Sequence, residues 1–193
     1  PSHEASGFSL PDLPVSVALD ELDIDRIVFA EAAFGLASEL TLSGSLHLDE
    51  GTFAAELDGE RLDGPGGTLD LTAAYNEADN MLEVDFQLDE PENGVIANLL
   101  NLYGRPAVAL NLTGSGPVED FELRLGLDAD AQRVLSGTAR LEGAGGANHF
   151  TIAAEGPIGE LVVPSLRDLF GENSRLALEG AQREGGGLTI SRF

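Results

Sequence analysis

Cysteine, lysine and tryptophan are all absent from this 193-residue sequence, and the first two absences narrow its function at once. Without cysteine the chain can form no disulfide, thiol nucleophile or thiolate metal site. Its ten basic residues are all arginine and stand against 34 acidic residues, which gives a formal net charge of -24 at pH 7. Such a field repels polyphosphate, so we exclude nucleic acid as a partner. Like charge also keeps exposed sheet edges apart, and we attribute the acidity to solubility.

Long apolar runs are missing as well. No stretch approaches the ~18 consecutive apolar residues of a membrane-spanning helix. The chain starts at Pro1 without an initiator methionine or a signal-like apolar region, and it ends at Phe193 directly after a strand-like pattern. We therefore expect a segment cut from a longer exported protein, with any signal or membrane anchor outside it.

Residues with the spacing of a catalytic or metal site are also lacking. His3, His47 and His149 are scattered, and no serine lies in a Gly-x-Ser-x-Gly turn. The segments Asp23 to Asp25 and Asp128 to Asp130 lack the glycine and distal glutamate of a calcium loop. Carboxylates are abundant, but no pair stands apart, and aromatic platforms for a sugar are scarce. We predict that the chain is not an enzyme and has neither metal nor cofactor.

What the sequence does contain is alternation of apolar and polar residues. Leu82, Val84, Phe86 and Leu88 share one parity, with charged or amide residues between them. The same two-residue period recurs from Leu13 onward, and glycine-rich turns separate the segments. A period of two indicates strands with one buried and one wet face. We predict an all-β fold of about ten to twelve strands, joined by short links into an antiparallel meander.

Two segments break this period. Residues Gly94 to Tyr103 and Pro164 to Phe170 carry their apolar residues at helical spacing, and Pro164 suits a first helical turn. Each helix is too short to be stable alone, so we expect both to dock on the apolar face of the sheet.

The alternating residues add up to one long apolar surface, which leaves two architectures open. The surface either closes on itself as a β-sandwich or barrel core, or curls into a trough that stays partly open. An open trough exposing about 600 Å² of apolar area would forgo roughly 15 kcal/mol, the whole stability of a typical domain. We therefore expect an open trough to be filled, and acyl chains are suitable occupants because each buried CH₂ contributes about 0.8 kcal/mol.

Four short segments resemble the TamB family of envelope proteins, within the AsmA-like group: Leu10 to Val15, Leu62 to Gly67, Asp89 to Gly94 running into Leu99-Leu100, and Gly114 to Phe121. The likeness extends from about Leu10 to Phe170 and is strongest to an interior, groove-building part of these proteins. It implies that residues 1–193 form one continuous segment of a long U-shaped sheet, or β-taco, with residues 91–106 as the one place of subdivision.

The resemblance also implies a function. Such proteins are anchored in the inner membrane, cross the periplasm, conduct phospholipid between the inner and outer membranes, and pair with a TamA-like outer-membrane barrel. In this chain, pattern and family together assign the groove lining and the helices that plug or rim the groove. The expected lining residues are Leu40, Leu42, Leu46, Leu48, Leu69, Leu71, Leu82, Val84, Phe86, Leu88, Val108, Leu110, Leu112, Phe121, Leu123, Leu125, Phe150 and Ile152. The expected plugging residues are Val95, Ile96, Leu99, Leu100, Tyr103, Leu166, Leu169 and Phe170.

Two other functions stay open at this stage. The family has also been linked to outer-membrane protein assembly, so the chain could be a chaperone or scaffold that offers its sheet edges by β-augmentation. It could instead be a closed β-sandwich from a surface protein. In either case, exposed strand edges would allow edge-to-edge self-association.

Overall fold

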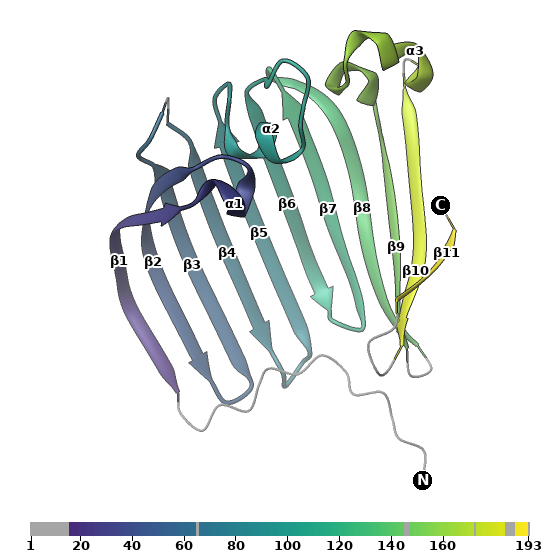
Figure 1. Cartoon of the computed structure of the whole chain (residues 1–193). Coiled ribbons are helices and arrows are strands. Elements are labelled where there is room, and N and C mark those ends of the chain that lie inside the picture. The colour runs from purple at the N-terminus through teal and green to yellow at the C-terminus, as the bar shows by residue number, and fades with distance from the viewer. Residues whose placement is uncertain (1–15, 65, 145–146, 172, 184–187, 193) are drawn as a thin grey trace.

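The computed structural model describes residues 16–64, 66–144, 147–171, 173–183 and 188–192 as one eleven-stranded antiparallel sheet. Its strands follow one another in sequence order, each paired with the next (Figure 1). The predicted all-β antiparallel meander is therefore confirmed, although Leu13 and Val15, where the alternation was expected to begin, lie outside the described residues. The strands are β1 (Val17–Phe29), β2 (Ser38–Asp49), β3 (Thr52–Arg61), β4 (Thr68–Asn76), β5 (Met81–Glu90), β6 (Val108–Pro117), β7 (Asp120–Ala129), β8 (Gln132–Ala144), β9 (Ala147–Gly156), β10 (Ser174–Arg183) and β11 (Leu188–Arg192).

The register pairs apolar positions with apolar positions across the sheet. One row runs through Leu57, Leu71, Phe86, Leu112 and Leu125, each directly opposite the next on strands β3 to β7. Directly opposed residues on neighbouring strands point to the same face of a sheet. The alternation within each strand therefore becomes a single apolar face over the whole meander, with the polar positions on the other side.

The shape of the sheet differs from both expectations. The strands form one sheet rather than two facing sheets, so a closed sandwich is wrong for the described residues, and the sheet is not strongly curled. Strong curvature in an antiparallel sheet comes from bulges. Register shifts occur here at the β1/β2, β7/β8 and β10/β11 pairings, whereas the five successive pairings from β2 to β7 run without a shift. The middle of the sheet is left open for that reason.

Short helical segments lie at one end of the sheet, which is the upper end in Figure 1. They comprise α1 (Glu31–Phe34), α2 (Val95–Leu99), the 3-10 turns η1 (Ile158–Leu161) and η2 (Pro164–Leu166), and α3 (Arg167–Phe170). Pro164 occupies a first helical position, as expected, but its segment is a 3-10 turn followed by a single α-turn. No helix in the described part of the chain is long and apolar enough to cross a membrane.

Helix α2 is shorter than the predicted helix from Gly94 to Tyr103, because it ends in a Schellman motif. Asn101 has a left-handed φ of 50°, its N–H bonds the Asn98 carbonyl at 3.0 Å, and the Leu102 N–H bonds the Ala97 carbonyl at 2.9 Å. This pair of bonds ends a helix at a left-handed residue and places the next residue against the last turn. The helical stripe predicted through Leu100 and Tyr103 is therefore wrong beyond Leu99, and Ala97 and Leu102 are buried instead.

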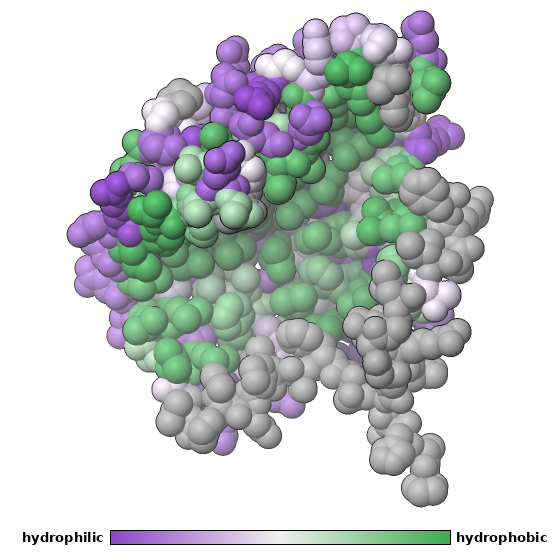
Figure 2. All heavy atoms as spheres, in the orientation of Figure 1, coloured by the Kyte–Doolittle hydropathy of each residue, from purple (hydrophilic) through white to green (hydrophobic). Residues whose placement is uncertain are grey.

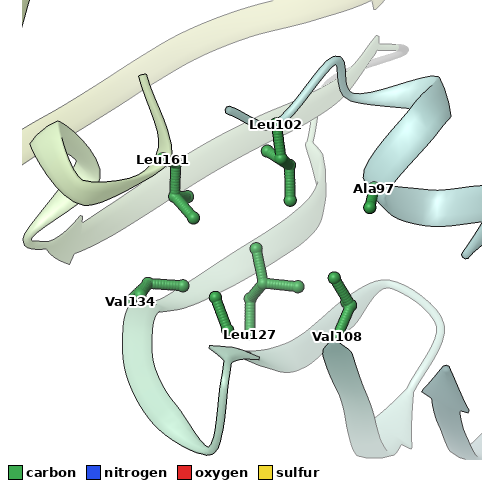
Figure 3. Packing of buried hydrophobic residues seen from close by; sticks show 7 residues of the cluster. Ala97, Leu102, Val108, Leu127, Val134 and Leu161 are labelled. Atoms are coloured by element: carbon green, nitrogen blue, oxygen red, sulfur yellow. The ribbon is translucent and has the colours of Figure 1, made fainter. Parts of the chain in front are cut away.

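The main cluster of buried residues lies where these helical segments meet strands β6 to β8 (Figure 3). It consists of Ala97, Leu102, Val108, Leu127, Ala129, Val134 and Leu161. The backbone N–H of Tyr103 bonds the Leu161 carbonyl at 2.9 Å, which ties the segment after α2 to η1. We call α2, the turn through Tyr103 and η1 together the roof. No large side chain of the described residues is fully enclosed, as expected for a single-layered sheet.

Candidate functional site

The candidate site is the apolar face of strands β2 to β9. All eighteen predicted lining residues lie on it, because the register links them row by row across these strands. Figure 2 shows this face toward the viewer, with apolar residues over the strands and hydrophilic residues along the upper and left margins. The structure thus brings together side chains from residues 40 to 152 on one surface.

This face is half-open rather than sealed. Of the eighteen residues, Val108 and Phe121 are buried, and the others are all of intermediate exposure. In the core of a closed sandwich, residues of this kind would be covered by the opposing sheet. Here no second sheet covers them in the described part of the chain, so the apolar face is available to a partner.

Two glycines on the apolar face, Gly59 and Gly114, are covered by neighbouring side chains. A Cβ atom at Gly59 would lie 2.9 Å from the Leu69 Cγ atom, and one at Gly114 would lie 2.7 Å from the Phe121 Cζ atom. Large side chains that lie over a cross-strand glycine shield its backbone from solvent. At these two positions the face is therefore hydrocarbon although the strand contributes no side chain.

Charge is confined to one end of this face. Within the described strands β2 to β9, the positions of apolar-face parity are uncharged except for Arg61 and Glu90. Both lie at the upper end, where Arg61 is opposite Leu40 and Glu90 is opposite Val108. An acyl chain lying across the middle of the face would meet no charged group.

The opposite face is polar and mostly acidic. Asp58 and Asp70 are directly opposed on β3 and β4, and their hydrogen bond and mutual repulsion raise the pKa of Asp70. Exposed ion pairs such as Arg140 with Asp120, at 2.8 Å, add little stability because both partners are solvated. The charged side chains of these strands therefore lie mainly on the side of the sheet opposite the apolar face.

Glu90 connects the sheet to the roof. Its Oε1 atom accepts a hydrogen bond from the Val95 N–H at 2.9 Å, and its Oε2 atom accepts one from the Ile96 N–H at 2.7 Å. These N–H groups belong to the first turn of α2, where backbone N–H groups have no hydrogen-bond acceptor within the helix. Glu90 is 8% exposed, so its carboxylate fixes α2 over the end of the apolar face from a buried position.

Beneath α2 the apolar face deepens into a cavity of about 260 Å³. Its walls are Phe29, Ser38, Leu40, Gly59, Glu60, Arg61, Gly67, Thr68, Leu69, Leu88, Glu90, Val95, Ile96 and Leu99. The predicted lining residues Leu40, Leu69 and Leu88 and the predicted plugging residues Val95, Ile96 and Leu99 thus line the same half-open cavity.

Other predicted plugging residues do not contact this cavity. Leu100 and Tyr103 are 53% and 47% exposed, and Leu169 on α3 is 83% exposed. The side chains of Leu166 and Phe170 lie outside the described residues. Helical spacing selected these positions, but α2 ends too early for Leu100 and Tyr103 to face the sheet.

Arg61 is a component of the cavity that sequence reasoning missed. Its Nε and Nη2 atoms donate to the Asp63 carboxylate at 3.2 and 2.9 Å, while its Nη1 atom is buried without a hydrogen-bond partner. The Arg61 guanidinium and the backbone N–H of Glu39 hold the pKa of Asp63 down to about 2. An arginine at the last apolar-face position of a strand, two residues before an aspartate, was the available signal.

No group of three or more histidine or acidic side chains close enough to hold a metal occurs among the described residues. The chain matches no protein-family model, and no curated protein and no solved structure is significantly similar to it.

Proposed function

We propose that the apolar face binds the acyl chains of phospholipids, and that the chain is a groove segment of a periplasmic bridge that transfers lipid between membranes. One observation carries the proposal: eighteen apolar residues from six strands share one continuous face, and no second sheet within the described ranges covers it. A surface of this kind on a monomer marks a site for an apolar partner.

The chemistry of the face suits movement along it rather than tight capture. In its middle an acyl chain contacts leucine, valine and phenylalanine side chains, and each CH₂ group contributes about 0.8 kcal/mol wherever it lies. Neighbouring positions of the chain are therefore nearly equal in energy, while a charged headgroup stays in water at the margin. In a longer β-taco of this kind, further strands would complete the curl, and parts outside this segment would contact a TamA-like barrel.

The direct test is acyl-chain capture by the purified chain. We expect native mass spectrometry to detect bound phospholipid after incubation with phospholipid vesicles, and a photoactivatable acyl analogue to label the apolar face. Val84→Asp places a carboxylate between Ala73 and Gly114 in the middle of that face and should abolish labelling. Thr113→Asp is the matched control, because Thr113 is exposed on the polar side beside Asp85.

Failure of the wild-type chain to retain lipid would contradict the proposal. Equal labelling of folded Val84→Asp and Thr113→Asp chains would contradict it as well. In the full-length protein, Val84→Asp and Leu110→Arg should both block lipid transfer, and normal transfer by both would argue against a conduit.

The alternative of a chaperone that works by β-augmentation finds less support. Edge strand β1 carries acidic residues and has two register shifts against β2, between Leu19 and Leu22 and between Ile24 and Ile27. Acidic side chains and bulges are the features by which proteins keep an edge from pairing. Crosslinking of nascent barrel strands to this edge, rather than lipid to the face, would favour the chaperone.

A further inference from the structure

The cavity beneath α2 differs from the rest of the apolar face because α2 supplies part of its wall. At about 260 Å³ it exceeds the ~150 Å³ apolar cavities that stay dry and accept benzene. Most of its wall is hydrocarbon, from Leu40, Leu69 and Leu88 on the sheet and from Val95 and Leu99 on α2. A space of this size and lining fits part of an acyl chain and gives water few partners.

Arg61, which lines the cavity, also has one buried donor atom without a hydrogen-bond partner among the described residues. The Arg61 side chain is 10% exposed, Asp63 occupies its Nε and Nη2 atoms, and its Nη1 atom is buried without a partner. A buried N–H of a charged group is costly when it lacks an acceptor. Because Arg61 lines the cavity, a small rotation of its guanidinium would bring Nη1 to an acceptor on a ligand bound there.

The charges around Arg61 specify what kind of acceptor fits. The carboxylates of Asp63 and Glu90 both lie close enough to stabilise the Arg61 cation, so two negative charges already surround one positive charge. A third carboxylate would be repelled, and the net charge of -24 adds to the repulsion. A neutral carbonyl oxygen accepts the hydrogen bond without that penalty.

We propose that the cavity beneath α2 is a resting site for one acyl chain of an ester lipid, whose ester carbonyl accepts a hydrogen bond from Arg61 Nη1. This inference rests on the proposed acyl-binding function and adds a substrate class and a position to it. The middle of the face lets acyl chains move, whereas the cavity holds one chain at the roof. Its preference is for acyl esters over free fatty acids and over alkyl ethers.

The absence of native tryptophan allows a site-specific test. Leu99→Trp places a single indole at the cavity, and Leu176→Trp places one on the apolar side of β10, opposite Ala154 and outside the walls of the cavity. Each chain is titrated with a medium-chain monoacylglycerol, the alkylglycerol ether of the same length and the corresponding free fatty acid. A blue shift of the indole emission reports the arrival of hydrocarbon.

We expect Leu99→Trp to bind the ester on the order of tenfold more tightly than the ether or the acid, as one hydrogen bond to a charged donor provides. Leu176→Trp should show no such preference. In the Leu99→Trp background, Arg61→Met should remove the preference for the ester over the ether.

Two outcomes overturn the resting site. Equal binding of ester and ether at Leu99→Trp would show that solvent satisfies Arg61, and tightest binding of the free acid would show that the local charge balance is different. The lipid-binding function itself would fail in a separate way, with no response from either reporter. The ester-to-ether comparison uses a chain with Arg61 intact, so it does not depend on the folding of Arg61→Met.

Discussion

Replacing Glu90 with glutamine should release α2 from the sheet, and the expected cost follows from two hydrogen bonds. The Glu90 carboxylate accepts from the Val95 and Ile96 N–H groups at 2.9 and 2.7 Å. Glutamine keeps the shape but presents one carbonyl oxygen and one NH₂ group. One of the two buried N–H groups then faces a donor, and the remaining bond loses its charge.

Hydrogen bonds to charged groups contribute about 1.5–3 kcal/mol each, and a buried donor left without an acceptor costs about 1–3 kcal/mol. Losing one bond and weakening the other should therefore lower the free energy of unfolding by about 2–3 kcal/mol. Glu92→Gln is the matched control, because Glu92 is exposed two residues away and a surface change of this kind stays within ~0.5 kcal/mol.

Urea denaturation at pH 7, followed by circular dichroism of the sheet, measures the difference between the two variants. Hydrogen exchange adds a local measurement, since the Val95 and Ile96 amides should lose protection in Glu90→Gln but not in Glu92→Gln. Equal midpoints for the two variants, together with protected amides at α2, would refute the assignment of Glu90 as the group that fixes the roof.

Three further outcomes follow from the same structure. Asp63→Asn should lower the free energy of unfolding by about 1–2 kcal/mol at pH 7. Because Arg61 depresses the pKa of Asp63 to about 2, the stability that the Asp63 carboxylate adds is complete above its unfolded pKa near 3.9 and disappears as pH falls toward 2. Denaturation curves across that pH range would show the loss. Gly59→Ala should lower the free energy of unfolding by about 1–2 kcal/mol, because the added methyl group overlaps Leu69. The loss should be smaller in a Leu69→Ala background, and an equal loss in both backgrounds of the double-mutant cycle would contradict the contact. Raising the ionic strength should increase self-association measured by sedimentation, since salt screens the repulsion between chains of charge -24, and a salt-independent monomer would count against edge pairing.

The sequence was sufficient to predict the strands and the face on which each apolar side chain lies. Leu82, Val84, Phe86 and Leu88 alternate with polar residues, and only an extended strand places such residues on one side. The meander follows from the short links between strands, since consecutive antiparallel strands need only a tight turn. These features depend on local sequence and chain connectivity, which a pattern records.

The curvature and the roof could not be predicted in the same way. Curvature depends on where the register shifts, and the bulges in β1 between Leu19 and Leu22 leave no distinct mark in the alternation. The end of α2 depends on Asn101 in a left-handed conformation, which moves Leu102 into the core and leaves Tyr103 exposed. Helical spacing alone extends the helix through all three residues, whereas asparagine at this position was a signal for the Schellman motif.

In a single-layered sheet, the same apolar surface determines both the stability of the fold and the binding of an apolar ligand. An apolar face of intermediate exposure buries part of its area in the free chain, so the sheet depends on cross-strand contacts and on the roof for its stability. A lipid that binds only the folded chain adds stability by mass action, about 2.7 kcal/mol at a concentration one hundred times its Kd. Under the proposed function, a charge such as Val84→Asp therefore removes this added stability as well as the binding. A surface that conducts lipid has to stay partly exposed in the empty chain, because complete burial would stabilise the empty fold and leave no room for the lipid.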